Sequence, residues 1–333
     1  MPQNNNISNK TIVITGASSG VGKAMALELA RTGARLVLSA RRREALDELA
    51  AECEHLGALA LVVPADMNSA QGIRLLAENA AAFGGTIDVW INNAGVLAFG
   101  PLEDIPASVN EQVIKTNLIG YITAAHTVLP YFKQQGHGIL INNISVGGWF
   151  PTPYGAAYSA SKFGLRGFSD ALKGELKGWP EIHVCDLFPA FLDTPGLQHA
   201  ANYTGRELKP IPPLYPPRKV ARAVVKLISR PRAATKIGFT SGLIHAASAL
   251  FPGVSRSALV FIIRRYLKRA RVTAHTDGNV ITPVRYGTSA EGGWKKSNPK
   301  PLLKKVAALG LATAAGLLLG YFLPKAGADT QYE

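Results

Sequence analysis

The residues best suited to chemistry stand in the stretch YSASK, residues 158–162, where a tyrosine precedes a lysine by four positions. On a helix, two side chains at this spacing lie on one face, about one turn apart. They are either two ordinary helix residues or a phenol held beside a cation for proton transfer. The choice depends on what the rest of the chain supplies.

A tyrosine that transfers protons near neutral pH needs a strongly altered pKa. The free phenol has a pKa of about 10, so this value must fall by about 3 units, roughly 4 kcal/mol. One cation about 4 Å away contributes on the order of 4 kcal/mol at an effective dielectric near 20. The ammonium of Lys162 is therefore sufficient to activate Tyr158, whereas a neutral hydroxyl group is not.

The elements that must position this pair alternate between short apolar runs and longer amphipathic stretches. Runs that are apolar throughout are typical of strands covered on both faces, and helical crossovers between them favour a parallel sheet. The sequence therefore predicts an α/β fold with a doubly wound parallel sheet of the Rossmann type. Strands are expected at 11–15, 35–40, 58–63, 87–91, 138–144 and 182–188, and helical segments at 22–32, 43–56 and 70–83. Seven prolines then make 189–217 a long irregular loop of the kind that often binds ligands.

The first predicted strand leads into a glycine-rich turn, TGASSGVGK, with glycines at 16, 20 and 22. Glycine lets backbone N–H groups approach a pyrophosphate at a helix N-terminus, where the helix dipole favours anions. A glycine triad alone is weak evidence, but its place after the first strand of a βαβ series strengthens it. We therefore expect a dinucleotide at this turn.

The end of the second predicted strand bears on the choice of dinucleotide. An acidic residue usually binds the ribose hydroxyls of NAD at this point, but here the sequence reads SARRR, with Ala40 in its place. Arg41 and Arg42 follow, and arginine binds a 2′-phosphate well. We therefore expect NADP in preference to NAD, the alternative being that both arginines merely begin an exposed helix.

Together these motifs resemble the short-chain dehydrogenase/reductase family over about residues 10–240. The family's elements stand in order: TGASSGVG (15–22), Asp66, NNAG (92–95), Asn117, Ser145, and Tyr158 with Lys162. Each motif is weak alone, but their order within one αβ pattern is a strong signal. One departure is PAFLDTP (189–195), where Ala190 replaces the family's usual glycine.

The resemblance implies a role for each residue. Tyr158 would exchange a proton with the substrate oxygen, while Lys162 lowers its pKa and holds the nicotinamide ribose. Ser145 would orient the substrate, and Asn117 would hold a water linked to Lys162. The implied cofactor-binding residues are Gly16, Ser18, Ser19, Gly20, Gly22, Arg41, Arg42, Asp66, Asn93, Ala94, Gly95, Tyr158, Lys162, Pro189 and Thr194.

The expected activity is hydride transfer between nicotinamide and a hydrophobic alcohol, aldehyde or ketone, with a lipid-like substrate favoured. Apolar side chains stand where the family builds its substrate pocket, although each could instead pack the loop onto the core. They are Trp149, Phe150, Tyr154, Phe191, Leu192 and Tyr203. The alternatives are a non-catalytic dinucleotide sensor or scaffold, and an epimerase or dehydratase on the same fold. Family resemblance suggests a dimer or tetramer.

The positive charge of the chain is concentrated near its C-terminus. Of the net +14, a surplus of ten lies within residues 254–305. Residues 241–271 form two apolar stretches followed by a basic run, which fits docking on anionic lipid. A dimer helix or a substrate-entrance helix is the alternative. No nucleic-acid recognition module is evident, so lipid is favoured over nucleic acid.

The last part of the chain is expected to anchor it to a membrane. A Rossmann domain over 1–240 and the extension over 241–271 would be followed by a polar linker, 272–301, and an anchoring helix, 302–324. Its uncharged core, 306–323, would span about 27 Å as a helix, against a hydrocarbon core of ~30 Å. A soluble hydrophobic helix is the alternative. The flanking lysines place the catalytic domain on the cytoplasmic side.

Other chemistries find little support in the sequence. The two cysteines, Cys53 and Cys185, lie outside any CxxC pattern, and the seven histidines are scattered. We therefore expect no metal site and no disulfide framework. Residues 1–10 are polar, which favours a cytoplasmic start over a secretory signal.

Overall fold

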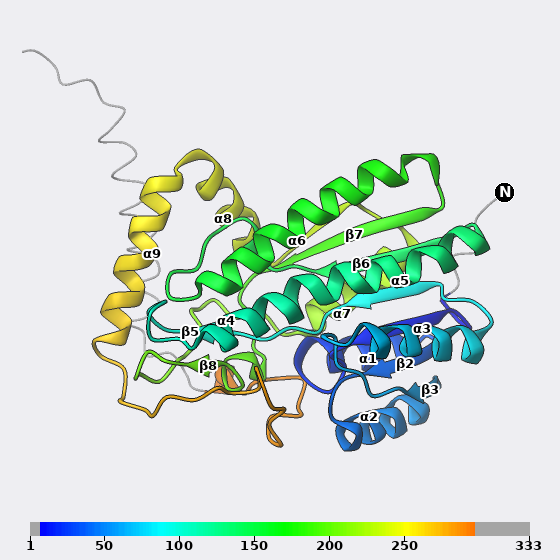
Figure 1. Cartoon of the computed structure of the whole chain (residues 1–333), viewed down its shortest axis with the longest axis horizontal. Helices are drawn as coiled ribbons and strands as arrows, with labels where there is room; N and C mark the ends of the chain where they lie inside the picture. Colours follow the sequence, from blue (N-terminus) through cyan, green and yellow to red (C-terminus); the bar gives the residue numbers. More distant parts are fainter. Residues whose placement is uncertain (1–6, 297–333) are drawn as a thin grey trace, which may run out of the picture. The chain divides into compact units, whose positions relative to one another are not determined.

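The computed structural model describes residues 7–296, and residues up to Trp294 belong to one compact unit. Its centre is a seven-stranded, all-parallel sheet in the order β3-β2-β1-β4-β6-β7-β9 (Figure 1). The strands are β1 (Thr11–Thr15), β2 (Arg35–Ser39), β3 (Leu59–Val62), β4 (Val89–Asn92), β6 (Gly138–Asn143), β7 (Ile182–Pro189) and β9 (Ala234–Ile237). This arrangement confirms the predicted doubly wound fold.

Both faces of the sheet are buried, because alternate residues of each strand point to opposite sides. In β1, Ile12 and Ile14 pack into one core while Val13 packs into the other. Three helices cover the first face: α1 (Gly20–Ala30), α2 (Arg43–His55) and α7 (Arg218–Ser229). Three more cover the second face: α3 (Ala70–Gly84), α5 (Gly120–Gln135) and α6 (Ala156–Glu175).

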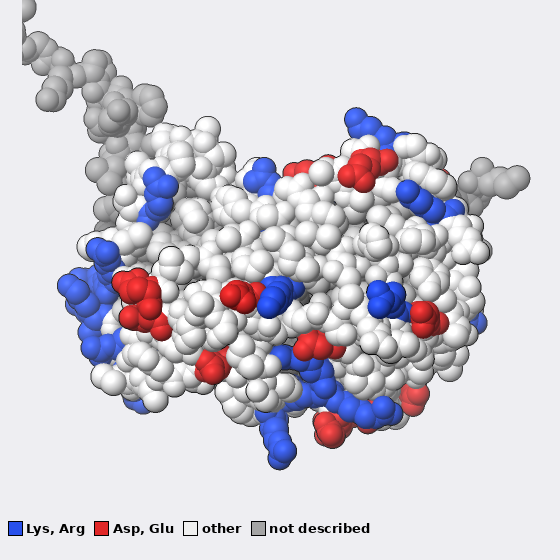
Figure 2. Space-filling model, viewed as in Figure 1, with Lys and Arg blue, Asp and Glu red and all other residues white. Residues whose placement is uncertain are grey.

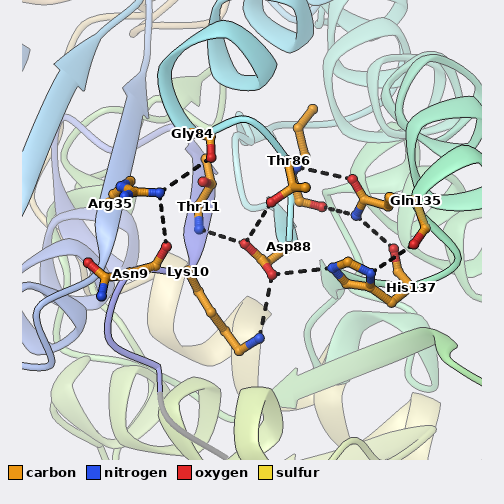
Figure 3. A network of polar contacts seen from close by, with 10 residues as sticks. Asn9, Lys10, Thr11, Arg35, Gly84, Thr86, Asp88, Gln135 and His137 are labelled. Atoms are coloured by element: carbon orange, nitrogen blue, oxygen red, sulfur yellow. Dashed lines mark hydrogen bonds and ion pairs between the residues drawn. The ribbon is translucent and has the colours of Figure 1, made fainter.

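At the amino ends of the strands, one carboxylate joins three of them (Figure 3). Asp88, just before β4, accepts hydrogen bonds from the Thr11 backbone N–H at 2.8 Å and from Thr86. Lys10 and His137, next to β1 and β6, each approach the same carboxylate at 3.4 Å. This network holds the strand starts together, at the edge of the sheet opposite to the predicted site.

The carboxyl ends of the strands form the other edge. From β1 the chain proceeds to β2 on one side, while β4 lies on the other side of β1. Such a switch in strand order leaves a crevice at the carboxyl edge, where α/β proteins bind ligands. The loops after β1, β4, β6 and β7 carry most of the predicted site residues, so the fold brings them to one edge.

Beyond the sheet, α8 (Phe239–Leu250) and α9 (Pro252–Leu267) form the predicted apolar and basic extension (Figure 1). The segment after α9, predicted to be a polar linker, instead packs on the carboxyl edge of the sheet as far as Trp294. Among residues 7–296, no helix combines the length and apolar character needed to cross a bilayer. The predicted anchor, 302–324, lies outside the described residues.

Candidate active site

The turn between β1 and α1 has the shape of a cradle for an anion. Gly16 and Gly20 adopt φ angles of +65° and +56°, a region that favours glycine. A Cβ atom at Gly22 would lie 2.1 Å from the Gly16 carbonyl oxygen, so only glycine fits at this position. The predicted phosphate turn is thus formed at the N-terminus of a helix, as a pyrophosphate requires.

The NNAG segment after β4 braces this turn. The Thr15 hydroxyl oxygen accepts hydrogen bonds from the backbone N–H groups of Asn93 and Ala94, at 2.9 and 3.1 Å. The Asn93 amide in turn donates to the carbonyl oxygens of Thr15 and Gly16. Gly16 also fits against Ala94, because a Cβ there would approach the Ala94 Cα to 2.7 Å. The predicted cofactor residues of the two loops therefore form one rigid unit.

A second chain of bonds connects this unit to the predicted catalytic lysine. Asn143, at the end of β6, donates its amide N–H to the Asn93 side-chain oxygen at 2.9 Å. Its backbone carbonyl oxygen accepts from the Lys162 ammonium at 3.2 Å. Asn143 was not among the residues predicted from the sequence, although two asparagines in a row at the end of β6 could have indicated it.

Asn117 lies in a π-helical turn, Lys115–Ile119, between α4 (Ala107–Ile114) and α5. Its side chain is fully buried, accepts from the Val96 backbone N–H at 2.8 Å and donates to the Val96 carbonyl at 2.9 Å. Its amide also lies 3.4 Å from the Ser161 hydroxyl, inside the YSASK stretch. Single π turns are frequent at functional sites. The role of Asn117 in holding a water remains a prediction, whereas its bracing role is evident.

Ser145 and Tyr158, two of the predicted catalytic residues, lie next to each other in the structure. Ser145 follows β6 with a φ angle of 101°, a strained conformation for a residue with a side chain. Its hydroxyl hydrogen-bonds the Tyr158 phenol and also accepts from the Gly147 N–H at 3.2 Å. Gly147 leaves room for the ring, because a Cβ there would lie 3.1 Å from Tyr158 Cε1. The strained backbone thus directs a hydroxyl group at the phenol.

Lys162 lies within reach of Tyr158 but in an apolar setting. Its ammonium nitrogen is 5.9 Å from the centre of the Tyr158 ring and 5.3 Å from that of the buried Tyr121. Burial lowers the pKa of Lys162 to about 7. Burial also raises the pKa of Tyr158, against a smaller opposing effect of the Ser145 hydrogen bond. The sequence predicted a lowered phenol pKa, but in the structure burial of the phenol dominates and raises it.

The depressed pKa of Lys162 predicts a pH-dependent stability for the cofactor-free protein. Between pH 7 and about 10 the unfolded chain keeps a proton on this lysine that the folded chain has released. The free energy of unfolding should therefore rise with pH in this window, by a few kcal/mol. Urea unfolding of wild type and Lys162→Met at both ends of the window measures the effect. Identical pH dependence in the two proteins would contradict it.

The two arginines after β2 have different surroundings. Arg41 donates to the backbone carbonyls of Asn279 and Ile281, and more weakly to that of Val280. The Arg42 side chain is half-buried and makes no hydrogen bond or ion pair within residues 7–296, although the charges of Glu44 and Glu48 act on it. Burial lowers the pKa of both, although both stay charged near neutrality. Only Arg42 is therefore available as it stands to an incoming 2′-phosphate.

The remaining cofactor candidates follow β3 and β7, at the same carboxyl edge of the sheet. Asp66 accepts from the backbone and side chain of Asn68, which fixes the turn before α3. Pro189 ends β7, and a Cβ at Gly20 would meet the Thr194 side chain at 3.6 Å, so this loop faces the glycine turn. The replacement at Ala190 is accommodated, since its N–H donates to Ile237 in β9.

The predicted substrate residues are not all gathered in one cavity. Trp149 stacks on Phe188 with ring centres 3.8 Å apart, and Leu192 packs on the core. Tyr203 hydrogen-bonds Asp277. Tyr154 does line a groove of about 440 Å³, whose other lining residues are Gly100, Pro101, Leu102, Glu103, Pro153, Ala156, Val260 and Arg264. Of these four residues, Tyr154 is thus the one that lines a groove, and α9 supplies a wall of this groove that the sequence did not indicate.

Comparisons with known proteins agree with this geometry. The chain is 30% identical over 297 residues to the uncharacterized oxidoreductase YxnA of Bacillus subtilis, covering 87% of this chain and 83% of that protein. It is 33% identical over 190 residues to 11-beta-hydroxysteroid dehydrogenase A of Sesamum indicum, covering 56% and 54% of the two chains.

Solved structures of the same kind carry the fold and a nucleotide. An alcohol dehydrogenase from the archaeon Thermococcus sibiricus, complexed with 5-hydroxy-NADP, matches with a TM-score of 0.60 at 27% identity over 68% of this chain and 95% of its own. A metagenomic short-chain oxidoreductase in complex with NADP matches with a TM-score of 0.60 at 28% identity, over 70% and 100%. The short chain dehydrogenase family model matches residues 10–203. The chain therefore belongs to the short-chain dehydrogenase family of oxidoreductases.

Proposed function

We propose that this protein is an NADP-dependent oxidoreductase that interconverts an apolar alcohol with its aldehyde or ketone. The observation that supports it best is the contact of the Ser145 hydroxyl with the Tyr158 phenol, with the Lys162 ammonium 5.9 Å from the phenol ring. The glycine turn supports a dinucleotide cofactor, since Gly16 and Gly20 have positive φ angles at a helix N-terminus and a Cβ at Gly22 would clash with the Gly16 carbonyl oxygen. Both solved relatives described above contain a form of NADP.

In the direction of reduction, the residues of this chain manage the substrate oxygen. Bound NADPH would supply a hydride to the carbonyl carbon. Tyr158 donates its phenolic proton to the oxygen as negative charge develops on it, which gives the alcohol. Ser145 donates a hydrogen bond that orients the same oxygen. Lys162 stabilises the resulting phenolate until a solvent proton restores the phenol, so protons and electrons balance.

Substrate turnover tests this proposal directly. The purified protein should oxidise NADPH in the presence of medium-chain and long-chain aldehydes or ketones, because the groove next to Tyr154 is lined mainly by apolar residues. Tight NADPH binding without any turnover would instead favour the non-catalytic sensor. Substrate conversion with no net NADPH consumption would favour an epimerase or dehydratase.

Cofactor choice gives a second expected outcome. Arg42 makes no hydrogen bond within the described chain and can pair with a 2′-phosphate, which only NADP carries. We expect Arg42→Ala to weaken NADPH binding at least tenfold and to leave NADH binding within about twofold, as measured by titration. Arg43, exposed and 3.6 Å from Asp47, offers the matched control Arg43→Ala. Equal loss for both nucleotides would contradict a 2′-phosphate contact.

We also propose that the α8–α9 region docks on an anionic membrane surface, at the cytoplasmic face. Val254, Phe261 and Ile262 are exposed, by 59%, 66% and 47%, at spacings that fall on one side of α9. Leu250, the last residue of α8, is 70% exposed. Basic residues gather at the C-terminal end of this helix, at the left edge of the view in Figure 2. An apolar stripe that ends in cations suits a bilayer containing anionic lipid.

Vesicle binding tests the membrane surface. Phe261→Ser in the full chain should reduce cosedimentation with phosphatidylserine-containing vesicles about tenfold, because a buried phenyl ring contributes roughly 1.5–3 kcal/mol. Leu59→Ser, 58% exposed in the edge strand β3, is the matched control and should bind like wild type. Unchanged binding of the Phe261 variant would exclude α9 as the docking surface.

A further inference from the structure

Residues 272–294, which we call the strap, run along the carboxyl edge of the sheet (Figure 1, orange). The strap begins beside β8 (Ala201–Asn202), where Asn202 and Thr276 exchange two backbone hydrogen bonds. It then passes His199, whose carbonyl oxygen accepts from the Asn279 N–H at 2.8 Å, and continues to Trp294. These backbone contacts show that the strap is packed on the domain as an ordered segment and is not a spacer.

The strap contacts three of the predicted cofactor-binding positions. The carbonyl oxygens of residues 279–281 accept from the Arg41 guanidinium. The Ser289 carbonyl oxygen accepts from the Gly20 N–H at 2.9 Å. The Trp294 indole donates to the Thr194 carbonyl at 2.9 Å. The strap therefore touches, in order, an arginine expected to bind the 2′-phosphate, the glycine turn expected to bind the pyrophosphate, and Thr194, a further predicted cofactor-binding residue.

At two of these positions the strap offers the same kind of atom as the nucleotide. A carbonyl oxygen bound to Gly20 N–H satisfies a donor of the glycine turn, which a phosphate oxygen would otherwise use. Three carbonyl oxygens around Arg41 occupy donors that a 2′-phosphate would use. The charge of Asp66 acts on Arg41, but no acidic side chain within residues 7–296 lies close enough to Arg41 to form an ion pair.

The strap is seated by close packing. A Cβ at Gly278 would lie 2.1 Å from the His199 carbonyl oxygen, and one at Gly287 would lie 2.2 Å from the His199 ring nitrogen. Val280 is fully buried. Glycine at these positions lets the strap lie directly on the segment before β8. A side chain at either glycine should therefore displace the strap from this segment.

From these contacts we propose that the strap is an autoinhibitory segment, which competes with NADP for the Gly20 N–H and Arg41 and must leave them before the nucleotide binds. The inference rests on the proposed cofactor site. Because only the strap-released form can bind, the apparent dissociation constant for NADPH equals the intrinsic constant divided by the released fraction. The strap thereby sets the nucleotide concentration at which the enzyme becomes active.

Hydrogen exchange of the full chain with and without NADPH tests the proposal. Saturating NADPH should slow amide exchange in residues 16–22 and accelerate it in residues 276–292. Slower exchange in both segments would overturn the inference, since the strap would then cover the nucleotide instead of competing with it. No response in residues 16–22 would overturn the proposed cofactor site itself, and the inference with it.

A pair of glycine variants gives an independent test. Gly278 and Gly293 both have positive φ angles, +54° and +74°, but a Cβ at Gly293 has nothing within 4 Å. Alanine therefore strains the backbone at both positions and clashes only at Gly278. Gly278→Ala should tighten NADPH binding about tenfold and speed NADPH association as measured by stopped-flow fluorescence. Gly293→Ala, the control, should change the dissociation constant and the association rate by twofold at most. Unchanged or weaker binding by Gly278→Ala would overturn autoinhibition.

Discussion

Tyr158→Phe should lower kcat for carbonyl reduction about 10³-fold while leaving NADPH binding within twofold. The variant removes only the hydroxyl oxygen, which hydrogen-bonds Ser145, so the fold should stay intact. A positioned general acid typically contributes 10²–10⁴-fold. Steady-state kinetics combined with NADPH titration separates the two quantities.

Tyr154 provides the matched control for this experiment. Tyr154 stands four residues before Tyr158 in the sequence and carries the same phenol group. Its side chain lines the groove described above. Tyr154→Phe should affect KM more than kcat. A Tyr158→Phe enzyme that retained a tenth or more of wild-type kcat would show that another group supplies the proton.

Lys162→Met should slow alcohol oxidation about 100-fold at pH 7. At 5.9 Å from the phenol ring, a positive charge contributes about 3 kcal/mol at an effective dielectric near 20, or about 2 pKa units. Burial already raises the pKa of Tyr158, so without a cation at this position the phenolate needed as base becomes rarer. The rate should then recover about tenfold for each unit of pH increase, as a pH–rate profile measures.

The exposed Lys177, just after α6, offers the control Lys177→Met, which should behave like wild type. The double variant of Tyr158 and Lys162 should lose no more activity than Tyr158→Phe alone, because the lysine acts through the phenol. A pH-independent deficit in Lys162→Met would mean that the lysine serves only to hold the nucleotide.

Much of the fold and the catalytic set could be predicted because their signals are local. Apolar runs marked the strands, and a spacing of four placed Tyr158 and Lys162 on one face of α6. The glycine turn follows from the order of strand, glycine and helix. These features depend on residues that are close together in the sequence, so local sequence patterns are sufficient to predict them.

What the sequence could not predict depends on distant contacts. Arg41 meets residues 279–281 more than 200 positions later, so a segment read as a polar linker became the strap. The pKa directions of Tyr158 and Lys162 depend on how deeply each is buried, which spacing does not indicate. Trp149 was expected in the substrate pocket, but its ring stacks on Phe188 from a neighbouring strand.

The most direct test follows deuterium from NADPH labelled at the transferred position of its nicotinamide to the product of an apolar aldehyde. The account predicts that wild type places one deuterium on the carbon bearing the new hydroxyl group, and that Tyr158→Phe forms about 10³-fold less of this alcohol in the same time. Mass spectrometry reads both results. An alcohol without deuterium, or equal formation by the two proteins, would contradict hydride transfer assisted by Tyr158.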